Sequence, residues 1–349
     1  MPSSCSARRS LFFSLVKNLM HTFILSERNS IIRKIRVKAM TTSLISILLA
    51  IGTSYLLLFP FREQQAALEE ETASALASEL ISGAVPSSIL EPFATISPLP
   101  LIILAMIVTY AFCSMGKYFA KLEEAVNVCF TVFSRMLGVV FFVLPFFFFT
   151  SSLELLLIDG GGSLLLIALG LALILAGTVS VLVFYLIRLK AGGVRLRPFL
   201  RKLPPLILEN CGINSSIDAV PFNIRYCVRN YGMDRKKLTE TLPLLAQVNF
   251  DGNCFLLMSI AMYIIFDMGI PITWYGIAIS AVLVFFLSLG APNQPGSILI
   301  GMMILLQYHG IEPTGVLAVV IYFEAFLGII LNLINTLGDI VTVAAAGEK

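Results

Sequence analysis

The chain has 349 residues, of which 58% are hydrophobic and only 13% are charged, and its net charge is +3. Soluble domains carry about 25% charged residues, so this composition excludes a soluble globular protein and predicts an all-α polytopic membrane protein. The six cysteines lack ligand spacing and the two histidines are isolated, which argues against a metal site built from thiolates or imidazoles.

The first residues, 1–38, are expected to be cytoplasmic and to hold at most a partial first span at 11–25. Arg8 and Arg9 precede this apolar stretch, but no small-residue cleavage site follows it, so we do not interpret it as a removable signal peptide.

The next part of the chain, residues 39–188, is predicted to hold membrane spans. Its apolar runs are near or above the roughly 17–25 residues that cross a bilayer. They cover 39–60, 99–114, 137–152 and 164–187. Between the first two lies segment 62–96, which is rich in glutamate and is expected to form an external acidic loop.

Lysine and arginine cluster in alternate connections, at 33–38, 117–121, 190–202 and 235–237. The positive-inside rule places all of these connections in the cytoplasm. Residues 197–230 must then enter and leave the membrane on one side, as a re-entrant hairpin. If the C-terminus is cytoplasmic, the same argument makes 275–306 a hairpin from outside. Two oppositely oriented hairpins predict an inverted-repeat transporter.

The tips of both hairpins are polar and rich in glycine or proline, at 212–221 and 288–297. Lipid cannot satisfy an open backbone, so such breaks survive only where they line a protein cavity or an ion site. A pair of them in corresponding halves of the chain indicates the binding site of a secondary transporter.

Two groups of polar residues lie inside apolar segments. Asn249, Asp251 and Asn253 flank Gly252, which favours a local break in the helix. A break would add free carbonyl oxygens to the Asp251 carboxylate, and such oxygens suit a hard monovalent cation.

The second polar group, Asn332, Asn335 and Asp339, has spacings of three and four residues and therefore shares one helix face. Glu324 and Gly328 lie roughly on the same stripe. For both polar groups, the alternative to an ion site is a polar seam that joins helices.

From about residue 97 to 345 the sequence resembles the dicarboxylate/amino acid:cation symporter family, which includes glutamate and neutral amino acid transporters. Four motifs in the family's order carry the resemblance. They are the first tip with Ser215, Ser216 and Pro221, then Asn249-Phe250-Asp251-Gly252, the second tip with Ser288 and Gly290, and Asn335-Thr336-Leu337-Gly338-Asp339.

The resemblance implies a homotrimer in which a static scaffold holds a transport domain that moves like an elevator. Residues 39–188 would form the scaffold and the start of the transport domain, and residues 189–349 would form the transport core. That core would comprise hairpin 1 at 197–230, a seventh helix at 236–268, hairpin 2 at 275–306 and an eighth helix at 313–345.

The resemblance also implies a set of site residues. Substrate-binding residues would be Ser215, Ser216, Asn253, Asn293, Gly328, Asn332 and Asn335. Cation-binding residues would be Asn249, Asp251, Ser288, Leu289, Ala291, Asn335 and Asp339.

No cofactor is expected besides the coupling ion, Na⁺ or H⁺, and the oxygen-rich site without histidine favours sodium. The expected partners are a small organic solute, the coupling cation and the bilayer of the cell (inner) membrane, and no nucleic acid.

The sequence departs from the family pattern at three places. Leu331 stands where acidic-substrate members carry arginine, and Gly328 stands where amino acid transporters carry the aspartate that holds the amine. Asp218 or Glu324 could supply that missing charge. The family also has two full spans before the one at 39–60. We therefore expect a divergent member with a shortened N-terminus, which would reflect either a wrong gene start or a truncated scaffold.

The predicted function is cation-coupled symport of a small organic solute such as an amino acid or a carboxylate. One alternative is a degenerate family member that no longer transports. Another is an intramembrane aspartyl protease, but Thr336 replaces a glycine of that signature, so we do not expect an enzyme.

Overall fold

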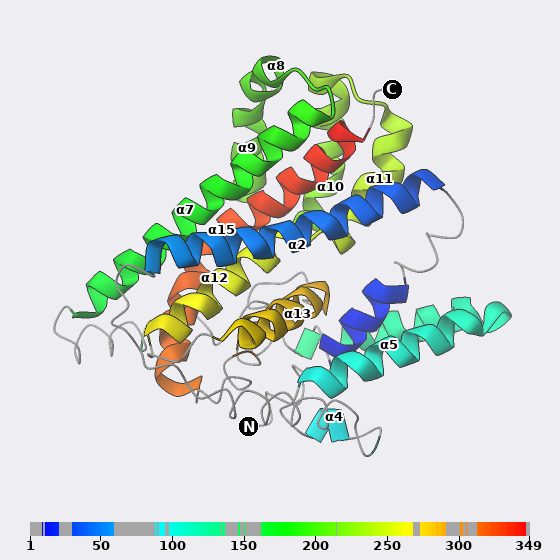
Figure 1. The fold of residues 1–349 in the computed structure, drawn as a ribbon. Coiled ribbons are helices and arrows are strands. Elements are labelled where there is room, and N and C mark those ends of the chain that lie inside the picture. The colour runs from blue at the N-terminus through cyan, green and yellow to red at the C-terminus, as the bar shows by residue number, and fades with distance from the viewer. Residues whose placement is uncertain are drawn as a thin grey trace.

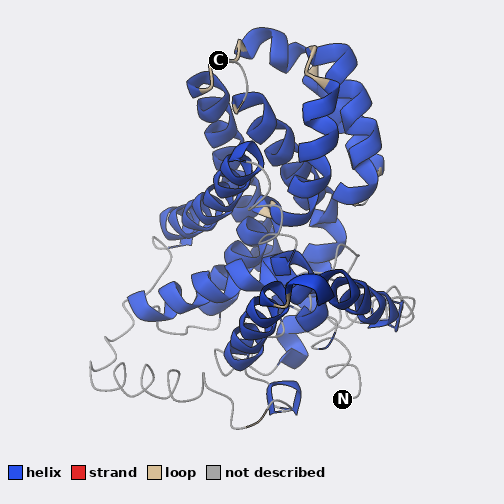
Figure 2. Cartoon of the chain, turned by 90° about the vertical axis from the view of Figure 1, so that its right-hand side faces the viewer, coloured by secondary structure: helices blue, strands red, loops and turns tan. Residues whose placement is uncertain are grey.

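The computed structural model describes residues 9, 11–20, 30–58, 88, 91–94, 98–133, 135–136, 146, 150, 162–213, 215–267, 273–290, 301–302, 305 and 313–346. These residues are almost entirely helical, and no strand occurs among them (Figure 2). The all-α prediction is therefore confirmed. The predicted external loop at 62–96 and the predicted span at 137–152 lie mostly outside the described residues.

The helices follow one another in chain order after an N-terminal helix, Leu11–Met20. They are α2 (Ser30–Leu58), α4 (Glu91–Ala94), α5 (Pro98–Ser114), η2 (Gly116–Tyr118), a helix at 119–133, α7 (Gly162–Ala191), α8 (Leu196–Arg201), α9 (Leu203–Gly212), α10 (Ser216–Tyr226), the π-helical η3 (Cys227–Tyr231), α11 (Arg235–Val248), α12 (Asp251–Asp267), α13 (Trp274–Gly290) and α15 (Pro313–Ala345).

Four helices among the described residues are long and apolar enough to cross a membrane, at Lys34–Leu58, Ala168–Ala191, Arg235–Tyr263 and Gly328–Ala345. The third crosses the break between α11 and α12. A fifth candidate would be the bent pair Pro100–Ser114 and Gly116–Phe133.

The bent pair differs from the single span that was predicted at 99–114. We expected the helix to end there in a basic connection, but after a bend of 107° the chain continues as a helix to Phe133. Gly116 lies at the bend with a φ of 49°, a left-handed value that glycine adopts without the usual steric penalty.

The core of the fold is formed by α2, α7, α12 and α15, which pack against one another (Figure 1). Glycine residues allow two pairs of these helices to pack closely. A Cβ at Gly177 of α7 would meet the ring of Phe255 at 2.4 Å, and a Cβ at Gly252 of α12 would meet the carbonyl oxygen of Leu331 at 2.4 Å. Glycine at both positions therefore lets α12 lie close to α7 and α15.

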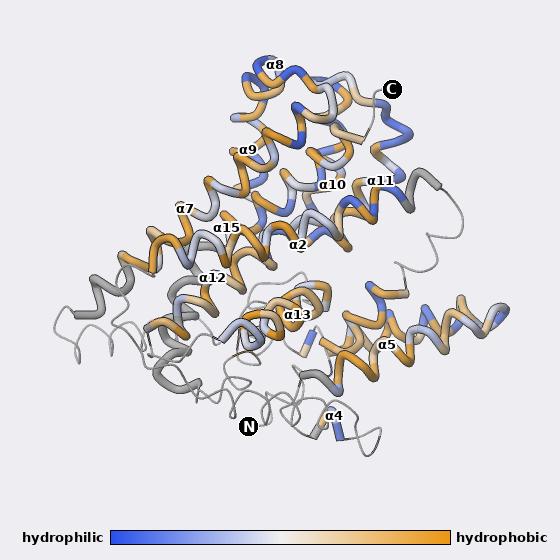
Figure 3. Tube along the Cα trace, in the orientation of Figure 1, coloured by the Kyte–Doolittle hydropathy of each residue, from blue (hydrophilic) through white to orange (hydrophobic). Residues whose placement is uncertain are grey.

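Hydrophilic residues gather at α8 and at the start of α11, at the end of the bundle that carries the C-terminus (Figure 3). Here Gly193, with a φ of 81°, ends α7. A cavity of about 580 Å³ at this end is lined by Arg195 and Lys202 from one basic connection and by Lys237 from another. Two connections that were predicted to share the cytoplasmic side thus lie together.

The first hairpin region consists of α9 and α10 with a short break between them, of which Ile213 and Ser215 are described. The predicted helix break near Gly252 is confirmed, because α11 ends at Val248 and α12 begins at Asp251. The predicted helix at 313–345 coincides with α15.

Candidate functional site

The break between α11 and α12 leads directly into a buried carboxylate. Asn249 and Phe250 are not helical, and Asp251 is the first residue of α12. All three side chains are buried, with Asp251 at 0% exposure. The break therefore places an ionisable group in the interior of the four-helix core.

Asp251 accepts one hydrogen bond on each carboxylate oxygen, and the donors come from two other helices. Ser43 Oγ of α2 donates to Oδ1 at 2.8 Å. Tyr185 OH of α7 donates to Oδ2 at 2.7 Å. Since both donors are neutral, these bonds fix the orientation of the carboxylate without cancelling its charge.

Asn249 connects this group to the second aspartate. Its amide nitrogen donates to Asp339 Oδ1 at 3.0 Å, and its amide oxygen accepts from Thr42 Oγ1 at 3.2 Å. Asp339 is 4% exposed and lies on α15. Residues from α2, α7, the break, α12 and α15 thus form one continuous polar cluster. We call it the carboxylate cluster: Thr42, Ser43, Tyr185, Asn249, Asp251 and Asp339.

Gly338 forms one wall of the carboxylate cluster. A Cβ at this position would approach Tyr185 OH to 2.6 Å, Asn249 Nδ2 to 2.7 Å and Asp251 Oδ2 to 2.8 Å. No real Cβ tolerates three such contacts, so only glycine allows α15 to pass this close to the cluster.

Asn335 joins α15 to α12 beside the carboxylate cluster. Its side-chain oxygen accepts from the backbone N–H of Gly252 at 2.7 Å, and its amide nitrogen donates to Asn253 Oδ1 at 2.8 Å. Asn335 is 2% exposed and Asn253 is 6% exposed. The structure therefore brings together the two polar groups that the sequence placed 82 residues apart.

Asn332, one turn before Asn335, connects α15 to the first hairpin region. Its side-chain oxygen accepts from Ser216 Oγ at 3.1 Å. Its amide nitrogen donates to the backbone oxygens of Ile213 and Asn210. The broken backbone between α9 and α10 is thus satisfied by a side chain from α15, as a break inside a membrane protein requires.

Ser215 and Asp218, two further residues of the first tip, have different surroundings. Ser215 is the N-cap of α10, where its side chain accepts from the backbone N–H of Asp218 at 3.3 Å. Asp218 is exposed. Gly328, another predicted substrate residue, is partly buried one turn before Asn332. The side chain of Glu324 is not among those described.

Of the second hairpin, the structure describes residues 275–290, 301–302 and 305. The predicted cation ligand Ala291 and the predicted substrate residue Asn293 lie outside the described residues. Ser288 is 1% exposed. The carbonyl oxygen of Leu289, expected to bind a cation, accepts a hydrogen bond from Asn18 Nδ2 at 2.5 Å. This carbonyl is therefore engaged by the N-terminal helix.

Among the described residues, neither Asp251 nor Asp339 forms an ion pair with a lysine, arginine or histidine. Arg188 of α7 is a basic residue whose charge acts on Asp251. One of its nitrogens, Nη1, is buried and has no hydrogen-bond partner among the described residues. The carboxylates are thus buried without a contacting counter-charge.

The ligand atoms of the carboxylate cluster are all oxygens. Hard cations such as Na⁺ prefer carboxylate, carbonyl and hydroxyl oxygens over nitrogen or sulfur. The hydroxyl groups of Thr42 and Ser43 can rotate, because each has one proton and two lone pairs. A bound cation could therefore take the place of the hydroxyl protons without moving the heavy atoms far.

Transition-metal chemistry has no support in the part of the chain that the structure describes, since no group of three His, Cys, Asp or Glu side chains could hold such an ion.

Sequence reasoning missed four residues at this site: Thr42, Ser43, Tyr185 and Arg188. The sequence did contain a polar pattern around Thr42 and Ser43, and another around Tyr185 and Arg188. Thr41, Thr42 and Ser43 form a polar run within an apolar span, and Tyr185 and Arg188 lie three residues apart in the span at 164–187 or just beyond it. Without the helix pairing, such residues are indistinguishable from ordinary packing positions.

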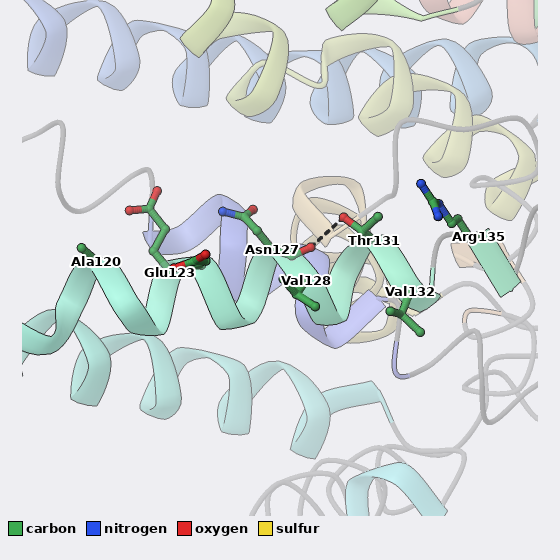
Figure 4. A pocket seen from close by; sticks show the side chains of 8 residues that line it. Ala120, Glu123, Asn127, Val128, Thr131, Val132 and Arg135 are labelled. Carbon is green, nitrogen blue, oxygen red and sulfur yellow. Dashed lines mark hydrogen bonds between the residues drawn. The ribbon is translucent and has the colours of Figure 1, made fainter.

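Two cavities lie away from the carboxylate cluster. One of about 470 Å³ is lined by eight residues at positions 120–135, such as Glu123 and Arg135, and its lining comes from the helix at 119–133 and the residues just after it (Figure 4). Neither this cavity nor the one near Arg195 is lined by a member of the carboxylate cluster. The side chains of the cluster are buried.

Comparison with known proteins gave two findings. The family profile described as "Sodium:dicarboxylate symporter family" matches residues 10–348. The match thus extends well before the stretch from 97 onward that carried the resemblance. An "Excitatory amino acid transporter" of Onchocerca volvulus is 26% identical over 141 residues, which is 40% of this chain and 28% of that protein.

Proposed function

Because the chain belongs to the sodium:dicarboxylate symporter family, whose members are transporters and not enzymes, we propose that it couples the movement of sodium to the uptake of a small organic solute. The solute would be an amino acid or a carboxylate. The general function, that of a membrane symporter, follows from membership of the family. The coupling ion, the solute and the mechanism are the proposal.

One observation supports the choice of a cation as the coupling partner. Asp251 and Asp339 are 0% and 4% exposed, and Asn249 joins them. A buried carboxylate without a contacting counter-charge costs several kcal/mol. Binding of Na⁺ among the surrounding oxygens would remove this cost, and proton uptake would do so in another way.

Solute binding is expected where α15 meets the first hairpin region, at Ser216, Asn253, Asn332 and Asn335. Asn335 contacts Asn253, a residue of this proposed solute site, and Gly252, which directly follows Asp251. A solute that orders Asn335 would therefore influence the carboxylate cluster, and a cation in the cluster would influence the solute. Such reciprocity is what symport requires.

The proposed transport cycle is alternating access of the elevator type in a homotrimer of the inner membrane. Cation binding would favour the state in which the second hairpin, at 275–306, is closed over the solute. A cation shifts this equilibrium only by its difference in affinity for the two states, so the solute and the cation would have to bind together.

The experiment that tests this function is uptake of radiolabelled solutes by proteoliposomes that contain the purified chain. A panel of amino acids and dicarboxylates is supplied with an inward gradient of sodium, of potassium or of protons. Uptake of one solute class that needs the sodium gradient is expected. Uptake that follows the proton gradient would assign proton coupling, and absence of any uptake would favour a degenerate, non-transporting member.

A further inference from the structure

Arg188 is the one charged residue outside the carboxylate cluster whose charge acts on Asp251 in the described part of the chain. It lies on α7 one turn after Tyr185, and residues three apart on a helix are neighbours. Tyr185 OH donates to Asp251 Oδ2 at 2.7 Å. The spacing on α7 therefore puts Arg188 on the side of the helix from which Tyr185 reaches the buried carboxylate.

Among the described residues, no hydrogen bond or ion pair of the Arg188 guanidinium explains its burial. Its Nη1 atom is buried and has no hydrogen-bond partner among the described residues. A buried donor without a partner is unfavourable, and a charged residue within a membrane span points to a functional role. By contrast, Lys190 on the same helix is exposed.

We propose that Arg188 acts as a tethered cation for the carboxylate cluster, so that Asp251 and Asp339 require fewer bound coupling cations than their oxygen ligands alone would take. The inference rests on the proposed function, because it concerns the same cation site. It assigns to Arg188 a role in setting the affinity for sodium and the coupling stoichiometry.

The sign of the effect follows from electrostatics. A fixed positive charge near Asp251 stabilises the cation-free cluster and repels an entering Na⁺. Its charge stays with the cluster, since α7 packs directly against α12 and α15. The empty protein therefore keeps part of the charge compensation that a bound cation would otherwise provide.

The test is a sodium titration of thermal unfolding, in detergent and without solute, for the wild type and three variants. Arg188→Gln removes the charge and keeps a polar side chain, Arg188→Lys keeps the charge, and Lys190→Gln removes an exposed charge from the same helix. Sodium is replaced by choline to hold the ionic strength constant, because exposed charges are sensitive to salt.

We expect Arg188→Gln to unfold earlier than the wild type without sodium and to recover as sodium is added. Its half-maximal sodium concentration should fall about tenfold or more, the effect of one partly screened charge within the protein. Arg188→Lys should stay within about threefold of the wild type, because it retains the charge, and Lys190→Gln should be unchanged, because exposed charges are screened.

A structural role alone would lower the stability of Arg188→Gln by the same amount at every sodium concentration. Such parallel curves, or weaker sodium binding in this variant, would overturn the inference while leaving sodium coupling intact. If neither the wild type nor any variant responds to sodium, the proposed function fails, and this inference fails with it.

Discussion

The Ser43 hydroxyl of α2 donates a hydrogen bond of 2.8 Å to Oδ1 of Asp251 at the start of α12, although 208 residues separate them in sequence. The hydroxyl oxygen of neighbouring Thr42 lies 3.2 Å from Oδ1 of Asn249 and 2.7 Å from the carbonyl oxygen of Ala39. The first long helix of the described core thus supplies two hydroxyl oxygens to the carboxylate cluster. Any cation held by Asp251 would also be in reach of α2, which links the site to the early part of the chain.

Removal of the Ser43 hydroxyl should weaken sodium binding. Ser43→Ala deletes a potential ligand and a hydrogen bond to a carboxylate, and such bonds contribute about 1.5–3 kcal/mol. We expect the half-maximal sodium concentration for thermal stabilisation to rise roughly tenfold or more.

The matched control for Ser43→Ala lies one turn further along α2. Ser46 is 0% exposed, and its hydroxyl has no partner among the described residues. Ser46→Ala should therefore leave the sodium response unchanged and keep or raise the stability, since it removes an unsatisfied buried group. Equal loss of sodium response in both variants would show that the hydroxyl of Ser43 is not a ligand.

Tyr185→Phe should destabilise the cation-free protein. The phenol donates to Asp251 Oδ2 at 2.7 Å and lies 3.2 Å from the carbonyl oxygen of Ile334. Loss of a bond to a buried carboxylate should cost about 1.5–3 kcal/mol, and thermal unfolding without sodium measures it. Tyr226→Phe is the control, because its hydroxyl donates to the carbonyl oxygen of Lys202 at 2.6 Å, outside the cluster. A similar or larger loss in the control would contradict this assignment.

Gly338→Ala should abolish the sodium response. The added Cβ would lie 2.6–2.8 Å from Tyr185 OH, Asn249 Nδ2 and Asp251 Oδ2, so these groups would have to separate. Gly52→Ala on α2 is the control, because a Cβ there meets nothing within 4 Å, and alanine favours a helix by up to about 1 kcal/mol. A folded Gly338→Ala protein with an unchanged sodium titration would show that cations bind elsewhere.

Asn332→Ala separates solute binding from cation binding. The change removes the side chain that joins α15 to Ser216 and to the backbone between α9 and α10. Thermal shifts with solute in saturating sodium should be lost, whereas the shift with sodium alone should persist. Loss of both shifts would mean that Asn332 supports the whole core, and retention of both would exclude it from the solute site.

Much of the fold was predictable because hydrophobic periodicity and helix breakers are local signals. The break at Asn249 and Phe250 was expected from the polar residues around Gly252, and the range of α15 was expected as well. The bend after Ser114 was not, since the apolar run simply ends there and its sequence does not indicate the 107° turn.

Only the site residues from α12, α15 and the break before α12 were predictable from the sequence. Asn335 and Asp339 were recognisable in the sequence because they are polar residues in an apolar helix. The same signal identified their hydrogen-bond partners, Asn253 and Asn249. The contributions of α2 and α7 depend on which helix faces pack together, and one sequence does not contain that information. Arg188 lies near the end of α7, and only the packing of α7 on α12 brings its charge near Asp251.

The most direct test of the account is a sodium titration of thermal unfolding for the wild type, Asp251→Asn and Asp234→Asn. Asp234 is the N-cap of α11, where asparagine also caps well, so this control removes a carboxylate away from the cluster. Sodium at about 100 times its dissociation constant should stabilise the wild type and the control by about 2.7 kcal/mol. Asp251→Asn should show no shift. A full sodium shift in Asp251→Asn would contradict a coupling cation at this carboxylate.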